Sequence, residues 1–266
     1  MAKTAMAIGA HPDDIEFMMA GTLILLREAG CEIHYMNLAD GCCGSATLPR
    51  REAARVREKE ARKAAALVGA EFHPSLAGDI EILYDKETLA RLGAVVRRVN
   101  PQILLVPSPD DYMEDHMNTS RLAVTAAFCM GMRNFPTRPR TRPVAADCTV
   151  YHALPYGLRD GLRRRVRAGL YVDIGSVREK KRRMLACHRS QKEWLDRSQG
   201  IDAYLVTMEE MGAEVGRLSG RFSHAEGWRR HLHLGLSPVE RDPLAEVLGD
   251  KAFIDEAYER LLERGG

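Results

Sequence analysis

Short apolar segments alternate with loops and amphipathic helical segments along the first half of the chain, and this alternation limits the fold more than any other feature. Consecutive strand–helix–strand units are right-handed and place their strands parallel in one sheet. We therefore predict an α/β, Rossmann-like fold of three layers, in which helices cover both faces of a mainly parallel sheet. The predicted segments are strands at residues 4 to 10, 32 to 38 and 103 to 106, and helices at residues 15 to 26, 49 to 68, 85 to 99 and 118 to 130.

The second half of the chain follows a loop rich in proline and arginine at residues 133 to 143. Ser176 and Glu179 have the spacing of a capping box that opens a basic helix. We expect a single domain over residues 1 to 266, with a core of about 1 to 132 and a C-terminal α+β appendage of about 145 to 266 packed on it. The segments predicted in this appendage are strands at 148 to 154 and 170 to 174, and helices at 203 to 218 and 244 to 264.

Charge and hydropathy exclude several classes of protein. The 39 Lys and Arg residues against 37 Asp and Glu leave a net charge of +2, which argues against nucleic acid or an anionic membrane as the main partner. The longest apolar stretch, residues 17 to 26, is shorter than the roughly 20 residues of a membrane span. The N-terminus lacks a signal-peptide pattern and the six cysteines do not form a disulfide framework, so we expect a cytoplasmic protein with reduced thiols.

Side chains that can bind a metal lie just after two of the predicted strands. His11 and Asp14 follow the first strand, and His116 follows the strand at 103 to 106. Because the carboxyl ends of parallel strands meet at one edge of a sheet, these three side chains converge if the two strands are neighbours. Two imidazoles and one carboxylate suit zinc, with a further position open for water, and Asp13 lies beside them. Helix capping is the alternative role for His11.

Four sequence motifs resemble one known family. Residues 10 to 14, Ala-His-Pro-Asp-Asp, resemble the signature of the LmbE-like and PIG-L zinc-dependent N-deacetylases. Residues 111 to 116 resemble the second, histidine-bearing motif of that family. The segment from 181 to 191 is similar to a downstream element, and residues 224 to 228 are similar to a late Ala-Glu-Gly-aromatic segment. Together the motifs span nearly the whole chain, about residues 5 to 235.

The resemblance implies both an activity and a set of roles. His11, Asp14 and His116 would bind Zn²⁺, and Asp13 would act as general base on the attacking water and then return the proton to the leaving amine. The implied reaction removes an N-acetyl or similar N-acyl group from an amino sugar, such as N-acetylglucosamine, or from a glycoconjugate. The expected partner is therefore this small-molecule substrate, and a homo-oligomer is left open.

One position departs from the commoner second motif, which has another histidine three residues before the ligand. Met113 occupies that position and can neither donate a hydrogen bond nor hold a proton. A different group must then help zinc to stabilise the oxyanion of the tetrahedral intermediate. We predict His188 for this role, with Tyr112 or a backbone amide as the other candidate donor. The alternative for His188 is a surface histidine near the end of a helix.

Two further residues are candidates for substrate binding. Arg57 matches an arginine-then-glutamate pattern of the family on the second helix, where the arginine reaches the substrate. The alternative is a solvated arginine on a charged helix. Asp79 is predicted to bind a sugar hydroxyl, although a turn at residues 78 and 79 would also explain an aspartate there.

Two other functions are compatible with an α/β fold. A metal-dependent phosphoesterase could use the same His/Asp cluster, but such enzymes typically need a second metal ion close to the first, and the sequence offers no second clear ligand cluster for it. A Rossmann-type nucleotide-binding module is disfavoured, because the loop after the first strand lacks the three-glycine phosphate fingerprint.

Overall fold

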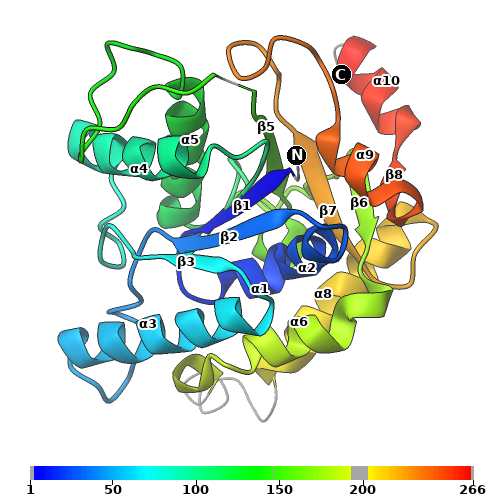
Figure 1. Ribbon diagram of the computed structural model, residues 1–266. Helices are drawn as coiled ribbons and strands as arrows, with labels where there is room; N and C mark the ends of the chain where they lie inside the picture. Colours follow the sequence, from blue (N-terminus) through cyan, green and yellow to red (C-terminus); the bar gives the residue numbers. More distant parts are fainter. Residues whose placement is uncertain (1–2, 146, 193–202, 265–266) are drawn as a thin grey trace.

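A computed structural model describes residues 3–145, 147–192 and 203–264. Its centre is an eight-stranded sheet with the strand order β3-β2-β1-β4-β5-β7-β6-β8 (Figure 1). Strands β3, β2, β1, β4 and β5 are parallel to one another. Strand β7 is antiparallel to its neighbours β5 and β6, and β8 is antiparallel to β6. The prediction of a mainly parallel sheet is confirmed. The strands are β1 (Thr4–Gly9), β2 (Glu32–Asn37), β3 (Glu71–His73), β4 (Ile103–Val106), β5 (Thr149–Ala153), β6 (Leu170–Asp173), β7 (Ala225–Arg230) and β8 (Ala252–Ile254).

Helices cover both faces of the sheet, as predicted. One face packs against α4 and α5, and the other packs against α1, α2, α3, α6 and α8 (Figure 1). No helix in the described ranges is long and apolar enough to cross a bilayer. The helices are α1 (Asp14–Met18), α2 (Ala20–Glu28), α3 (Arg50–Leu67), α4 (Lys86–Val99), α5 (Glu114–Phe128), α6 (Arg178–Leu185), α8 (Ala203–Ser219), α9 (Pro243–Leu248) and α10 (Glu256–Arg264), with 3-10 turns η1 (Tyr156–Leu158), η2 (Gly175–Val177) and η3 (Gly249–Lys251).

The central strands are buried on both sides, which explains their continuous apolar sequences. In β1, Ala5 and Ala7 belong to the core under α1 and α2, while Met6 and Ile8 belong to the core under α4 and α5. The first strand therefore has no solvent-facing side. Its carboxyl end is fixed between β2 and β4, and the loop that follows it starts from a rigid position.

A side chain caps the N-terminus of α4, but the side-chain cap predicted for α6 does not form. The Asp85 side chain caps α4 by accepting hydrogen bonds from the backbone N–H groups of Glu87 and Thr88, at 2.8 and 2.9 Å. The predicted capping box at Ser176 does not form, because Ser176 lies inside η2 and α6 begins after Val177 without a side-chain cap.

Two segments predicted as single helices are each divided into shorter elements. The helix at 15 to 26 is divided at Met19, where φ is −134° and the backbone leaves the helical region between α1 and α2. The helix at 244 to 264 contains α9, η3, the short strand β8 and α10. Gly249 has a positive φ of 54°, which breaks the helix, and pairing with β6 then determines β8.

Candidate metal centre and its cavity

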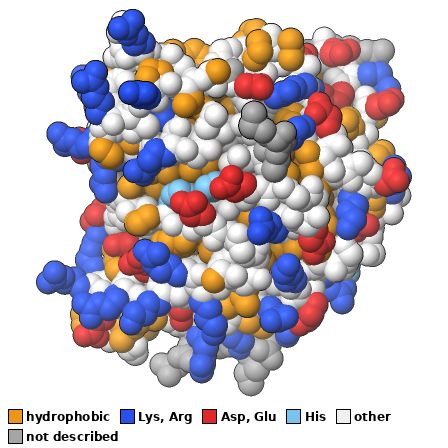
Figure 2. All heavy atoms as spheres, viewed as in Figure 1, with side chains coloured by type: hydrophobic (Ala, Val, Ile, Leu, Met, Phe, Trp, Pro, Cys, Tyr) orange, Lys and Arg blue, Asp and Glu red, His pale blue; other side chains and the backbone are white. Residues whose placement is uncertain are grey.

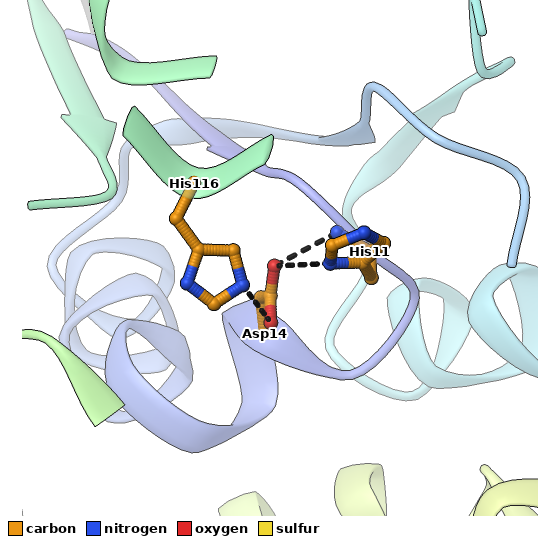
Figure 3. A group of neighbouring side chains, drawn as sticks. All are labelled: His11, Asp14 and His116. Carbon is orange, nitrogen blue, oxygen red and sulfur yellow. Dashed lines mark hydrogen bonds and ion pairs between the residues drawn. The ribbon is translucent and has the colours of Figure 1, made fainter. Parts of the chain in front are cut away.

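The carboxyl ends of β1 and β4 bring three potential metal ligands together. The two strands are direct neighbours, so the loop after β1, with His11, lies next to the first turn of α5, with His116. Asp14 lies between the two imidazoles (Figure 3). Its Oδ2 is 3.7 Å from His11 Nδ1, and its Oδ1 is 3.4 Å from His116 Nε2. Ligand atoms of the three residues lie within 4.8 Å of one another.

Backbone groups hold the Asp14 carboxylate in this position. Its Oδ2 accepts hydrogen bonds from the backbone N–H groups of Ala10 and His11, at 3.0 and 2.8 Å. The Asn37 side chain on β2 donates to the carbonyl oxygen of His11 at 2.6 Å. The loop of residues 10 to 14 is therefore tied both to itself and to the neighbouring strand.

Two aspartates that the sequence analysis did not single out contact the outer nitrogens of the imidazoles. Asp115 Oδ2 lies 2.9 Å from His11 Nε2, and Asp111 Oδ1 lies 3.0 Å from His116 Nδ1. Carboxylates in such places orient metal-binding histidines and increase their basicity. Both residues belong to the motif at 111 to 116, so the motif contained the signal, but the sequence alone assigned them no role.

Charge in the cluster fits a bound cation. Burial by itself lowers the pKa of His11, but hydrogen bonds to Asp115 and Asp14 more than offset it and raise the pKa to about 9. Burial likewise opposes a charge on His116, yet Asp14 and Asp111 raise its pKa well above the ordinary value. The same imidazoles hold the pKa of Asp14 well below its usual range despite burial. The carboxylates thus favour positive charge at this point, and two imidazoles with one carboxylate are suitable zinc ligands.

Asp13 is held beside the cluster in an uncommon backbone conformation, with φ of 111°. Its Oδ2 accepts a hydrogen bond from the Tyr204 hydroxyl at 2.7 Å and lies 3.3 Å from Arg57 Nη2. Burial raises the pKa of Asp13, and the Arg57 guanidinium offsets only part of this effect. Tyr204 belongs to α8, and no motif in the sequence pointed to it.

Arg57 is buried at the cluster, so the alternative of a solvated arginine is wrong. It is 3% exposed, and its guanidinium also donates to the carbonyl oxygen of Pro12. A Cβ atom on Gly41 or Gly44 would collide with the Arg57 side chain, which explains the glycines in this loop. Asp79 supports the same loop, because its two oxygens accept from the backbone N–H groups of Gly41 and Cys43, each at 2.8 Å.

A cavity of about 340 Å³ opens beside the cluster and is within the range of small-ligand sites. His11, Asp13, Asp14 and His116 contribute to its wall. Aromatic, aliphatic and polar side chains line the rest, which gives the cavity apolar faces and hydrogen-bonding groups together. These include Phe17, Tyr112, Tyr156 and Tyr204 among the aromatic residues, and Arg57, Asp79 and Gln191 among the polar ones.

His188 lies behind this wall and does not line the cavity. It is fully buried, which rules out the alternative of a surface histidine, and its Nε2 is 3.4 Å from Glu16 Oε2. Burial alone lowers the pKa of His188, but Glu16 and Asp13 raise it overall. Its predicted role as oxyanion donor stays a prediction, whereas Tyr112 is a cavity-lining residue.

Comparison with known proteins identifies the family. The family described as PIG-L: GlcNAc-PI de-N-acetylase matches residues 6–127. The 4-oxalmesaconate hydratase of Pseudomonas putida is 31% identical over 198 residues, which are 71% of this chain and 74% of that protein. The chain belongs to the PIG-L family.

Other PIG-L-like relatives agree with this result. The diacetylchitobiose deacetylase of Thermococcus kodakarensis is 29% identical over 196 residues, covering 71% of this chain and 70% of that protein. The structure of the N,N'-diacetylchitobiose deacetylase from Pyrococcus horikoshii has a TM-score of 0.73 at 24% identity, covering 89% of this chain and 87% of that one. That likeness confirms the three-layer fold.

Proposed function

We propose that this protein is a zinc-dependent hydrolase that removes an N-acetyl, or a similar N-acyl, group from an amino sugar or glycoconjugate. The observation that carries the proposal is the meeting of His11, Asp14 and His116 with Asp13 on the wall of one cavity. Aromatic faces and hydrogen-bonding groups in one cavity suit a sugar. The likeness to diacetylchitobiose deacetylase supports the same chemistry.

In this proposal, His11, Asp14 and His116 hold the metal, while Asp115 and Asp111 orient the two imidazoles. When bound, zinc would supply Lewis-acid polarisation and would lower the pKa of a water molecule to about 7. Asp13 accepts the proton of the attacking water on its carboxylate and returns it to the leaving amine. Tyr204 and Arg57 hold that carboxylate in place.

The hydratase relative raises a second candidate reaction, addition of water to an unsaturated polycarboxylate. Such a substrate carries several negative charges, so it needs cationic side chains in addition to a bound metal ion. Among the described residues that line the cavity, Arg57 is the sole lysine or arginine. It is already engaged by Asp13 and the carbonyl oxygen of Pro12. The charge of the cavity therefore favours an uncharged acylated sugar over a polyanion.

A substrate screen tests the proposed reaction. Zinc-loaded protein is incubated with N-acetylated sugars and glycoconjugates, with aryl phosphates and with unsaturated di- and tricarboxylates. We expect release of acetate and of a primary amine in equal amounts from at least one acetylated sugar. Release of phosphate or consumption of the double bond, without acetate release, would instead establish the phosphoesterase or the hydratase reaction.

Replacing His116 with Ala tests the proposed ligands. We expect the cavity to lose its zinc ion and the protein to lose activity, because a carboxylate and one imidazole hold zinc poorly. The circular dichroism spectrum and the melting transition should show that the fold is retained. The measurement is zinc per chain in the variant against wild type. An unchanged zinc content would refute the assignment.

The oxyanion donor can be found by comparing two conservative variants. Tyr112 lines the cavity, and its ring centroid lies 5.7 Å from that of His116, whereas His188 is behind the wall. We therefore expect Tyr112→Phe to lower kcat by about 10²- to 10³-fold with little change in zinc content, as for a lost transition-state donor. His188→Gln should have a smaller effect on kcat. The reverse order would restore the role predicted for His188.

A further inference from the structure

A second group of histidine and acidic side chains lies on the edge of the sheet formed by β2 and β3. These strands pair in parallel, with His34 opposite Glu71 and Met36 opposite His73. Because side chains alternate between the faces of a strand, Glu32, His34, Glu71 and His73 share one face. Met36, on the same face, belongs to the core under α4. Arg98 and Val99, in the last turn of that helix, line the same cavity as the group.

This group is separate from the metal centre described above. On β2, His34 lies opposite Met6 of β1, whereas Asn37 lies opposite Gly9, which is two residues before His11. Three residues along a strand correspond to about 10 Å. The two groups therefore have no ligand in common.

Three donor atoms of this second group converge. His34 Nδ1 lies 2.9 Å from His73 Nε2 and 3.7 Å from Glu71 Oε2. Ligand atoms of the three residues lie within 4.8 Å of one another. A tetrahedral zinc ion with bonds of about 2.0 to 2.1 Å separates neighbouring donor atoms by about 3.3 Å. The two observed distances bracket this value, so each needs to change by only about 0.4 Å.

The surroundings of both imidazoles favour the neutral ring over the imidazolium. Burial lowers the pKa of His34, and burial together with His34 and Arg98 lowers the pKa of His73 to about 4. Both shifts favour the neutral ring, which is the form that binds a metal, and the proton in the 2.9 Å hydrogen bond between the rings would move to an outer ring nitrogen when the ion binds. Two glutamates outweigh the single charge of Arg98, so the surroundings remain favourable for a cation.

The cavity beside the two imidazoles and the contact of His34 with Glu32 also suit a metal ion. The imidazoles are buried, at 4% and 8% exposure for His34 and His73, but they adjoin a cavity of about 440 Å³ that both glutamates line. Figure 2 shows histidine side chains flanked by acidic ones near the middle of the viewed face. Glu32 Oε1 lies 3.7 Å from His34 Nε2, the nitrogen that does not face the other donors. A carboxylate in that place can orient a ligating imidazole.

We propose that His34, His73 and Glu71 form a second divalent-metal site, suited to zinc, with water completing the coordination. The ion joins side chains of β2 and β3 and therefore fastens the three-residue edge strand to the sheet. Its role is structural, because it is remote from the cavity in which Asp13 lies.

Zinc content in the His116→Ala background isolates this site. Full-length His116→Ala protein is stripped with a chelator, dialysed against buffered zinc and analysed for metal per chain. We expect one zinc ion to remain bound, and we expect the added change His73→Gln to remove it. Zinc should also slow amide hydrogen exchange in β3 of the His116→Ala protein, which a loosely adsorbed ion would not do.

Two further variants control for folding and for non-specific binding. Glu71 has an exposed side chain, at 63%, so Glu71→Gln should fold normally and still weaken zinc binding by about tenfold or more. His231→Gln is the matched histidine control. Its ring pairs with His152 at 3.0 Å, and in the described part of the chain neither histidine has a carboxylate at ion-pair distance. This control should keep the zinc ion. The proposal is overturned if His116→Ala protein binds no zinc, or if His73→Gln and Glu71→Gln leave its zinc binding unchanged.

Discussion

Replacing Asp13 with Asn is expected to lower kcat by about 10²- to 10⁴-fold, the usual contribution of a general base. The amide has nearly the same shape as the carboxylate and can still contact Tyr204, but it cannot accept a proton from water. Asp13 is not part of the group of ligand atoms formed by His11, Asp14 and His116. Zinc content should therefore remain that of wild type while turnover is lost.

Two companion variants make this result specific. Tyr204→Phe removes the 2.7 Å hydrogen bond to Asp13 without removing the carboxylate, and it should lower kcat less than Asp13→Asn. Asp110→Asn makes the same chemical change at an exposed carboxylate that does not line the cavity, and it should leave kcat unchanged. Near-native turnover in Asp13→Asn protein would move the general base to another residue.

Replacing Lys181 with Met is expected to lower the free energy of unfolding by about 3 to 5 kcal/mol, the usual cost of breaking a buried ion pair. Lys181 Nζ lies 2.6 Å from Glu226 Oε1, and both side chains are almost completely buried, at 2% and 3% exposure. Glu226 also accepts hydrogen bonds from the backbone N–H groups of Gly21 and Thr22 at the start of α2. Without Lys181, its charge remains buried with only these backbone partners.

Urea unfolding of four variants checks this interpretation: Lys181→Met, Glu226→Gln, the double variant of these two, and a control. Lys180→Met is the matched control on the same helix, and it should change the free energy of unfolding by no more than about 0.5 kcal/mol. The double variant Lys181→Met with Glu226→Gln should be more stable than the sum of the single changes predicts, because no unpaired charge is left. Equal stabilities of Lys181→Met and Lys180→Met protein would show that the pair contributes nothing.

Sequence reasoning located the candidate metal-binding cluster but not its surroundings. His11 and Asp14 are three residues apart, so the local chain brings them together, and only His116 depended on the prediction that β1 and β4 are neighbours. Asp111 and Asp115 are in a recognised motif, yet their contacts with the imidazole rings depend on side-chain orientation, which a motif does not specify.

Other features could not be predicted at all. Tyr204 reaches Asp13 from α8, 191 residues away in the chain. The burial of His188 against Glu16 is one such feature, and its role as oxyanion donor stays a prediction. Short strands such as β3 and β8 have three residues each, too few to give a periodic pattern.

The sequence by itself determined the α/β class, the parallel core and the loop of residues 10 to 14, because periodicity, turn residues and spacings of a few residues act locally. Only the tertiary structure decided the partners of Asp13, the pairing of Lys181 with Glu226 and the meeting of His34 with His73. These contacts join segments far apart in the chain. They exist because burial of the apolar strand and helix faces fixes which elements are neighbours, and polar side chains then pair with whatever groups that arrangement brings within reach.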